Sequence, residues 1–142
     1  MGCVSAACLA ELGHRVIGVD RDQLKVDAVL AGRSPFYEPG LEGLVRKNLS
    51  AGRLCATTCL PDAIEGAEIA LICVGTPSER NGNLGLEQLR RVAGEIGEAL
   101  ARRERRLIVA VRSTVFPGTC DEVVAPLLGE RAAVVSNPEF LR

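Results

Sequence analysis

Apolar residues along this chain alternate between helical spacing and short continuous runs. Apolar residues three and four positions apart are typical of a helix that buries one face. Short runs of branched residues between turn residues are typical of buried strands. The pattern predicts helices over 4–12, 23–31, 41–51, 61–65, 86–101 and 119–128, and strands over 15–19, 53–58, 68–74, 106–113 and 132–136.

The predicted strands and helices alternate along the whole sequence. A strand that returns to its sheet through a helix lies parallel to the preceding strand, and the connection is right-handed. The alternation therefore predicts an α/β fold with a doubly wound parallel sheet covered on both faces. No repeat or low-complexity linker divides the chain, so residues 1–142 are expected to form one domain.

The first twenty residues have the spacing of a dinucleotide-binding motif. Gly2 precedes Asp20 by eighteen positions, close to the roughly 20 residues between a glycine-rich phosphate turn and the carboxylate that binds a ribose. The preceding strand and the first two glycines of GxGxxG are not in the sequence. The chain is therefore expected to begin inside the motif and to form a Rossmann-type sheet that lacks its first strand.

The lost strand would lie between strands 15–19 and 68–74. Without it, these two strands are expected to leave a gap, to re-pair or to find another partner. Marginal stability and a tendency to aggregate follow from that expectation.

Polar residues follow the predicted strands at their carboxyl ends, where open α/β sheets bind ligands. Asp20 ends the first strand, and its carboxylate can accept hydrogen bonds from both ribose hydroxyls while repelling a 2′-phosphate. Lys25 lies one turn into the next helix and could reach the same ribose or phosphate. A solvated helix lysine is an equally good interpretation of Lys25.

Thr76 and Thr114 each follow a buried strand, and their hydroxyls could bond a phosphate, ribose or carboxamide. A threonine there is often only a turn or cap residue. Glu139 follows the last strand and could act on substrate as an acid/base or as a hydrogen-bond acceptor. Because it comes after Asn137 and Pro138, it also fits the first turn of a helix, and spacing alone favours that interpretation.

Composition and charge exclude several partners. The net charge of −1 creates no global field for nucleic acid or an anionic membrane. No apolar run approaches the roughly 20 residues of a membrane span, and no signal peptide is visible. A protein without nucleic-acid or membrane partners, located in the cytoplasm, is expected.

Six cysteines occur without a CxxC pair and with one histidine, so no metal site is expected and the thiols are expected to be free. A basic cluster follows the helix over 86–101 and is expected to be solvated and to favour the helix dipole. Its members are Arg102, Arg103, Arg105 and Arg106.

Five ordered segments carry a family resemblance: "VIGVD" with Lys25, "SPFYEPGLEGL", "ICVGTPS" with "NG" soon after, "RSTVFPGT" and "SNPEFLR". Together they resemble the N-terminal domain of the nucleotide-sugar 6-dehydrogenases, the UDP-glucose/GDP-mannose dehydrogenase family, over essentially the whole chain. Within the family, "ICVGTPSERNGNLGL" and "VRSTVFPGT" are most similar to members that act on GDP-mannose.

The resemblance implies NAD as cofactor and oxidation of the C6 alcohol of a nucleotide sugar, GDP-mannose, to the uronate in two hydride transfers, through an aldehyde held on a cysteine. It implies that the full-length protein is a homo-oligomer. It places Glu139 in catalysis and at the substrate, with backbone contacts from Phe140 and Leu141. It assigns cofactor binding to Gly2, Asp20, Lys25, Thr76 and Thr114.

The sequence also departs from the family pattern. The family's nucleophilic cysteine, its central dimerisation helix and its nucleotide-sugar domain are not in the sequence, so the chain is expected to be truncated at both ends and inactive alone. Cys59 in "TCLPDA" lacks the glycines and lysine of the nucleophile segment and is not expected to be the nucleophile. The incomplete phosphate turn is expected to weaken NAD binding.

Three alternatives remain open at this point. A UDP-glucose-type dehydrogenase has the same fold and the same strand-end residues. A hydroxyacid dehydrogenase shares the fold, but "VRSTVFPGT" and "NPEFLR" argue against it. A non-catalytic module that keeps a nucleotide crevice is the third.

Overall fold

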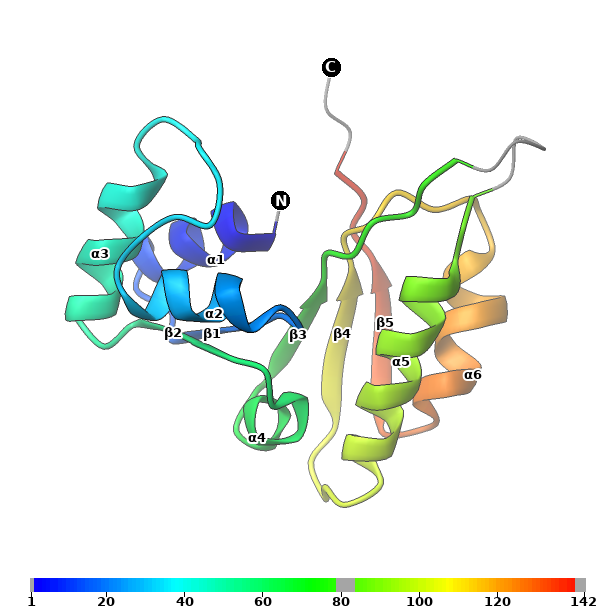
Figure 1. Ribbon diagram of the computed structural model, residues 1–142. Coiled ribbons are helices and arrows are strands. Elements are labelled where there is room, and N and C mark those ends of the chain that lie inside the picture. Colours follow the sequence, from blue (N-terminus) through cyan, green and yellow to red (C-terminus); the bar gives the residue numbers. More distant parts are fainter. Residues whose placement is uncertain (1, 79–83, 140–142) are drawn as a thin grey trace. The chain divides into compact units, whose positions relative to one another are not determined.

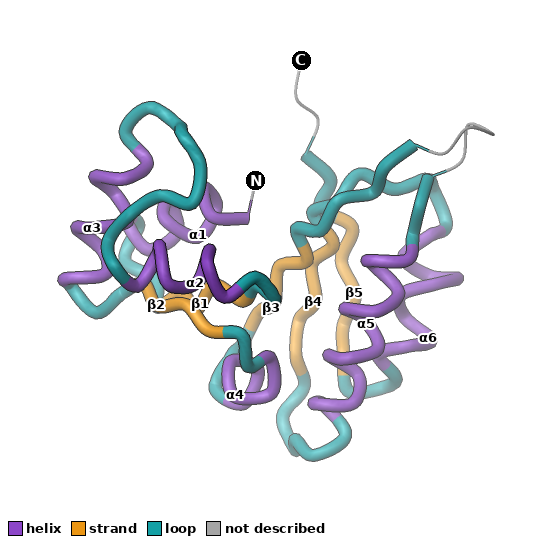
Figure 2. The backbone as a smooth tube through the Cα atoms, viewed as in Figure 1, coloured by secondary structure: helices purple, strands orange, loops and turns teal. Residues whose placement is uncertain are grey.

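The strands of the computed structural model, which describes residues 2–78 and 84–139, form two parallel sheets. Strands β1 (Val16–Val19) and β2 (Leu54–Thr57) make a two-stranded sheet. Strands β3 (Ile69–Ile72), β4 (Leu107–Val111) and β5 (Ala132–Ser136) make a three-stranded sheet in that order, and Figure 2 colours the strands orange. The chain divides into two units, Met1–Ala63 (unit 1) and Ile64–Arg142 (unit 2).

Unit 1 packs three helices against its sheet, in which β1 and β2 pair in parallel from Val16 opposite Leu54. The helices are α1 (Gly2–Glu11), α2 (Gln23–Leu30) and α3 (Leu41–Ser50). Small and branched side chains fill the space between these elements, as expected for a chain poor in aromatic residues. The buried members of this core are Ala7, Ala10, Val26, Val29, Leu41, Val45, Leu54 and Ala56.

A buried polar residue ties α1, α3 and the start of β2 together. Asn48 is fully buried, and its side-chain nitrogen donates to Glu11 Oε2 at 2.9 Å and to the Leu44 carbonyl at 3.0 Å. Its side-chain oxygen accepts from Arg53 Nε at 3.0 Å. Every polar atom of the carboxamide head is thus bonded, which is the condition for burying it at low cost.

Unit 2 places helices against its three-stranded sheet. Helix α5 (Glu87–Leu100) packs against α6 (Ala125–Leu128), and α6 packs on β5 (Figure 1). The short helix α4 (Leu60–Glu65) contains the boundary between the units. In α5, the buried residues recur at helical spacing: Leu89, Ala93, Ile96 and Leu100.

The α/β fold with parallel strands and the predicted element positions are confirmed, with boundaries within two residues of those expected. The predicted helix over 119–128 differs in form, because its first part, η1 (Cys120–Val124), is a turn of π-helix. The end of α5 differs too. Arg103 does not merely lie in solvent: it donates to the Ile64 carbonyl at 2.7 Å and to the Ala67 carbonyl.

The two strands expected to flank the lost strand, β1 and β3, are not paired with each other in the described part of the chain. Within residues 2–78 and 84–139, β1 pairs only with β2, and β3 pairs only with β4. Strand β4 is the strand of this described part that has a neighbour on both sides. The backbone groups on one side of β1 and of β3 therefore have no strand partner there.

Candidate cofactor and substrate site

In unit 2, three predicted site residues follow the carboxyl ends of neighbouring strands. Thr76 follows β3, Thr114 follows β4 and Glu139 follows β5. The strands are parallel and paired in register, from Ile69 opposite Ile108 and from Leu107 opposite Ala132. Parallel register brings all three carboxyl ends to one edge of the sheet, which is where open α/β sheets bind ligands.

Hydrogen bonds link these three residues in a row. Thr76 Oγ1 donates to the Thr114 carbonyl at 2.7 Å, and Thr114 Oγ1 donates to the Glu139 carbonyl at 3.4 Å. Each hydroxyl proton is therefore engaged in a hydrogen bond within the protein, while the oxygen keeps its lone pairs. The hydroxyl can thus act as an acceptor toward a ligand. The structure brings Thr76, Thr114 and Glu139 together, which sequence spacing alone could not do.

Glu139 forms an ion pair with the residue after β4. Arg112 Nη2 lies 2.8 Å from Glu139 Oε2, and the two side chains are 28% and 26% exposed. Residues 137–139 are not helical. The helix in whose first turn Glu139 was expected would continue beyond the described residues, so that interpretation stays a prediction. The ladder between β4 and β5 extends into this segment, since the Asn137 N–H donates to the Val111 carbonyl at 2.9 Å.

Two residues of this edge were missed by the sequence reasoning. Arg112 contacts both Asn137 and Glu139, and the buried Ser113 donates from Oγ to the Val74 carbonyl at 2.6 Å. Both residues stand at the carboxyl end of a predicted buried strand, directly before Thr114. That position was the available signal, because it is the one that singled out Thr114.

Cys73 lies beside the ion pair. Burial raises the pKa of the Cys73 thiol, while the nearby Arg112 lowers it and Glu139 raises it by smaller amounts. A thiol with a raised pKa stays protonated at neutral pH and is a poor nucleophile. Cys73 is therefore a structural part of this edge.

In unit 1, Asp20 and Lys25 meet at the end of β1. Asp20 Oδ1 accepts from the Asp22 N–H at 3.0 Å, and Oδ2 lies 3.4 Å from Lys25 Nζ. Both side chains remain about half exposed, at 46% and 51%. Asp22 in turn accepts from the Leu24 N–H at 3.0 Å and caps α2, which fixes the turn that carries both residues.

Gly2 begins α1, a ten-residue helix that packs on β1. The chain reverses between them at Gly13, whose φ is 102°. The start of α1 and the end of β1 therefore lie at the same end of unit 1 (Figure 1). Gly2 is the first residue of α1, and Asp20 directly follows β1. The first N–H groups of a helix lack intrahelical partners and favour an anion.

These groups fit the adenosine end of a dinucleotide. Asp20 is half exposed and offers acceptor oxygens to ribose hydroxyls, while Lys25 and the start of α1 offer positive charge and donors to a phosphate. Phe140 and Leu141, the remaining predicted site residues, lie outside the described part of the chain.

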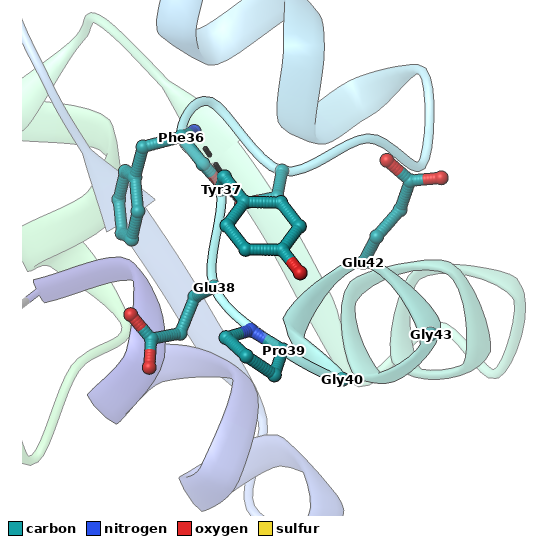
Figure 3. A pocket seen from close by; sticks show the side chains of 8 residues that line it. Phe36, Tyr37, Glu38, Pro39, Gly40, Glu42 and Gly43 are labelled. Atoms are coloured by element: carbon teal, nitrogen blue, oxygen red, sulfur yellow. Dashed lines mark hydrogen bonds between the residues drawn. The ribbon is translucent and has the colours of Figure 1, made fainter.

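An open pocket in unit 1 has none of the predicted site residues in its lining. It has a volume of about 540 Å³ and is formed by the loop between α2 and α3 together with the start of α3 (Figure 3). Tyr37 in this loop is 91% exposed, and Ser34 Oγ donates to the Phe36 carbonyl. The residues that line the pocket are Ser34, Phe36, Tyr37, Glu38, Pro39, Gly40, Glu42 and Gly43.

Two negative findings concern the described residues only. Over residues 2–78 and 84–139, no group of three or more His, Cys, Asp or Glu side chains is placed to hold a metal ion. Among the helices of that same part, none has the length and apolar character needed to cross a membrane.

Known proteins resemble this chain over its whole length. GDP-mannose 6-dehydrogenase of Pseudomonas putida is 47% identical over 150 aligned positions, covering 100% of this chain and 34% of the relative. UDP-glucose 6-dehydrogenase of Rhizobium meliloti is 41% identical, covering 100% and 33%. The chain thus spans about a third of the length of these relatives.

Solved structures also resemble this chain, over nearly its whole length. A ternary complex of GDP-mannose dehydrogenase from Pseudomonas aeruginosa superposes with a TM-score of 0.94 at 45% identity, over 99% of this chain and 34% of that protein. A UDP-glucose dehydrogenase from Pyrobaculum islandicum gives a TM-score of 0.93 at 38% identity, over 99% and 34%. The sequence profile of the UDP-glucose/GDP-mannose dehydrogenase family, NAD binding domain, matches residues 1–142. The chain belongs to the UDP-glucose/GDP-mannose dehydrogenase family, as its NAD-binding domain.

Proposed function

We propose that this chain is the cofactor-binding portion of an NAD-dependent dehydrogenase that oxidises the C6 alcohol of GDP-mannose to the uronate in two hydride transfers. The observation that carries the proposal is the hydrogen-bonded row of Thr76, Thr114 and Glu139 at one sheet edge. It combines hydroxyl acceptors for a cofactor with a carboxylate for a substrate. Bound NAD would accept hydride from a substrate carbon.

The residues of unit 1 are proposed to bind the adenosine end of NAD. Asp20 accepts hydrogen bonds from the ribose hydroxyls and repels a 2′-phosphate, which favours NAD over NADP. Lys25 neutralises Asp20 and lies close enough to it to contact the same ribose or an adjoining phosphate. The start of α1 at Gly2 supplies N–H groups to the pyrophosphate.

The residues of unit 2 are proposed to serve the reacting end. Thr76 and Thr114 accept hydrogen bonds from the cofactor, because their own protons are engaged. Glu139 faces the sugar and assists proton transfer or hydrolysis. Phe140 and Leu141 supply backbone contacts to the substrate.

For the whole protein we propose one NAD-binding domain over residues 1–142, a central dimerisation helix and a nucleotide-sugar domain that supplies the cysteine nucleophile. A homo-oligomer in the cytoplasm, without nucleic-acid or membrane partners, completes the proposal. Its support is the set of family motifs in the sequence. Gel filtration and fractionation of the complete protein test the oligomer and the location.

A UDP-glucose-type activity is the second candidate. The 41% identity to UDP-glucose 6-dehydrogenase of Rhizobium meliloti favours it. Steady-state assays of the complete gene product with GDP-mannose and UDP-glucose distinguish the two, and a higher kcat/KM with GDP-mannose is expected. A preference for UDP-glucose would make UDP-glucose the proposed substrate in place of GDP-mannose. If neither sugar nucleotide is oxidised, the enzymatic proposal is overturned.

Calorimetry on this chain tests the cofactor role of Asp20. NAD is expected to bind more tightly than NADP, and Asp20→Ala is expected to lower NAD affinity about 10- to 100-fold, as loss of one or two charged hydrogen bonds would. Asp62→Ala removes an exposed carboxylate from α4 and serves as the charge-matched control. Equal NAD affinity of the Asp20 and Asp62 variants would show that Asp20 does not contribute to NAD binding.

A further inference from the structure

We infer that Arg112 is a positioning residue that turns Oε2 of Glu139 toward the protein and leaves Oε1 for the substrate. The inference rests on the function proposed for Glu139. Arg112 Nη2 lies 2.8 Å from Oε2, in an ion pair rather than a directed hydrogen bond. Oε2 is buried and has no hydrogen-bond partner among the described residues.

The second nitrogen of the same guanidinium holds the preceding part of the segment. Arg112 Nη1 donates to Asn137 Oδ1 at 3.0 Å. One planar fork thus engages side chains at positions 137 and 139. A guanidinium is rigid and fully charged at neutral pH, so this double contact fixes orientation as well as charge.

Backbone contacts hold Glu139 on the same neighbouring segment. The Glu139 N–H donates to the Arg112 carbonyl at 3.4 Å, and Thr114 Oγ1 donates to the Glu139 carbonyl at 3.4 Å. Two residues that follow β4 therefore restrain Glu139 at its amide, its carbonyl and its carboxylate. A chain segment held at three points can present one carboxylate oxygen reproducibly.

This arrangement specifies how Glu139 works. A guanidinium has donors and no acceptor, so the oxygen facing it must be an acceptor. The remaining oxygen then serves as an acceptor toward a substrate hydroxyl or an attacking water. Reactive groups held by neighbours in this way lose rate steeply when their orientation is released.

The first experiment uses NMR of this chain. Three-bond couplings of the Glu139 side chain are expected to report one rotamer in the wild type and rotamer averaging in Arg112→Gln. Arg112→Lys, which keeps the charge but cannot make both contacts, is expected to give intermediate averaging. Arg105→Gln, which changes an exposed arginine before β4, is the control and is expected to leave the couplings unchanged. A single Glu139 rotamer in a folded Arg112→Gln variant would overturn the inference. Arg112→Met, which keeps the apolar stem, gives the same comparison if the Gln variant does not fold.

The second experiment measures kinetics of the complete protein. Arg112→Gln is expected to lower kcat about 10- to 100-fold with little change in the KM for NAD, and Arg112→Lys to recover only part of the loss because it keeps the charge without the double contact. Combined with Glu139→Gln, the Arg112 change should cost little more, because both act through one carboxylate. Full activity of Glu139→Gln would refute the proposed role of Glu139. Loss of activity in Glu139→Gln but not in Arg112→Gln would refute only the inference.

Discussion

At the scale of single residues, Glu11 shows how one surface carboxylate depends on its neighbours. Hydrogen bonds from Lys47 and then Asn48 lower the pKa of Glu11, with a smaller opposing effect of burial. Lys47 also forms an ion pair with Glu11, across the helices α1 and α3. The folded state of unit 1 therefore favours the ionised form of Glu11.

A pH dependence follows from the direction of this shift. A carboxyl whose pKa is lower in the folded than in the unfolded state stabilises the fold above the unfolded value, near 4.5, and loses that contribution as pH falls through the folded value. Glu11→Gln should therefore be less stable than wild type at pH 7, and the difference should shrink below about pH 4.5. Urea unfolding at a series of pH values measures it.

Glu38→Gln is the control, since it alters an exposed carboxyl in the loop before α3. Its stability difference from wild type is expected to be small at pH 7. A gap between Glu11→Gln and wild type that stays constant from pH 7 to pH 3 would contradict the assignment.

Residue-level chemistry was only partly readable from the sequence. The proximity of Asp20 and Lys25 followed from local spacing, because a strand end and the first turn of the next helix are close along the chain. The contact of Arg112 with Glu139 joins residues 27 positions apart and depends on the pairing of β4 with β5. An arginine after a strand resembles an ordinary surface residue until that register is known.

At the scale of elements, helices α5 and α6 approach each other at Gly97. A Cβ added there would overlap the Leu127 carbonyl oxygen and lie 3.2 Å from its carbonyl carbon. Both atoms belong to the backbone, so the helices would have to separate. A glycine is required at this point by a close approach and not by an unusual φ.

Gly97→Ala is therefore expected to lower the free energy of unfolding by about 1–3 kcal/mol, as overpacking does. Gly94→Ala, one turn earlier in α5, meets nothing within 4 Å. It is expected to raise stability by about 0.5–1 kcal/mol, because alanine is the better helix former. Chemical denaturation of both variants tests the pair, and equal effects would refute the close-contact argument.

Periodicity predicted the elements well because glycines end most helices and the apolar faces are regular. It could not predict the π-turn η1, since Cys120–Val124 has the same apolar spacing as a normal helix. It also missed the partners of Arg103. Those carbonyls belong to Ile64 near the end of α4 and to Ala67 after it, 39 and 36 positions earlier.

At the scale of the whole molecule, the pairing of strands predicts unequal local stability. Strand β4 has neighbours on both sides, whereas within the described residues β1 has one. The Ile108 N–H bonds the Glu68 carbonyl at 3.1 Å, and the Val16 N–H bonds the Arg53 carbonyl at 2.8 Å. Both amides thus donate to a backbone carbonyl, but Ile108 lies in a strand with two neighbouring strands and Val16 in a strand with one described neighbour.

Native-state hydrogen exchange is expected to be at least about 10-fold slower for Ile108 than for Val16, because opening β4 disrupts two strand pairs. Amide exchange followed by NMR at fixed pH measures both residues in one sample. Equal rates, or slower exchange at Val16, would show that pairing does not set local stability here.

The hydrogen bond from Thr114 to the Glu139 carbonyl has a thermodynamic consequence. A ligand that draws the Thr114 hydroxyl away from this carbonyl also loosens the segment that holds Glu139. Occupancy at the cofactor side and affinity at the sugar side are then linked, and linkage is reciprocal: each ligand alters the affinity for the other by the same factor. A single hydroxyl group would then set how strongly the two ligands cooperate or compete in binding.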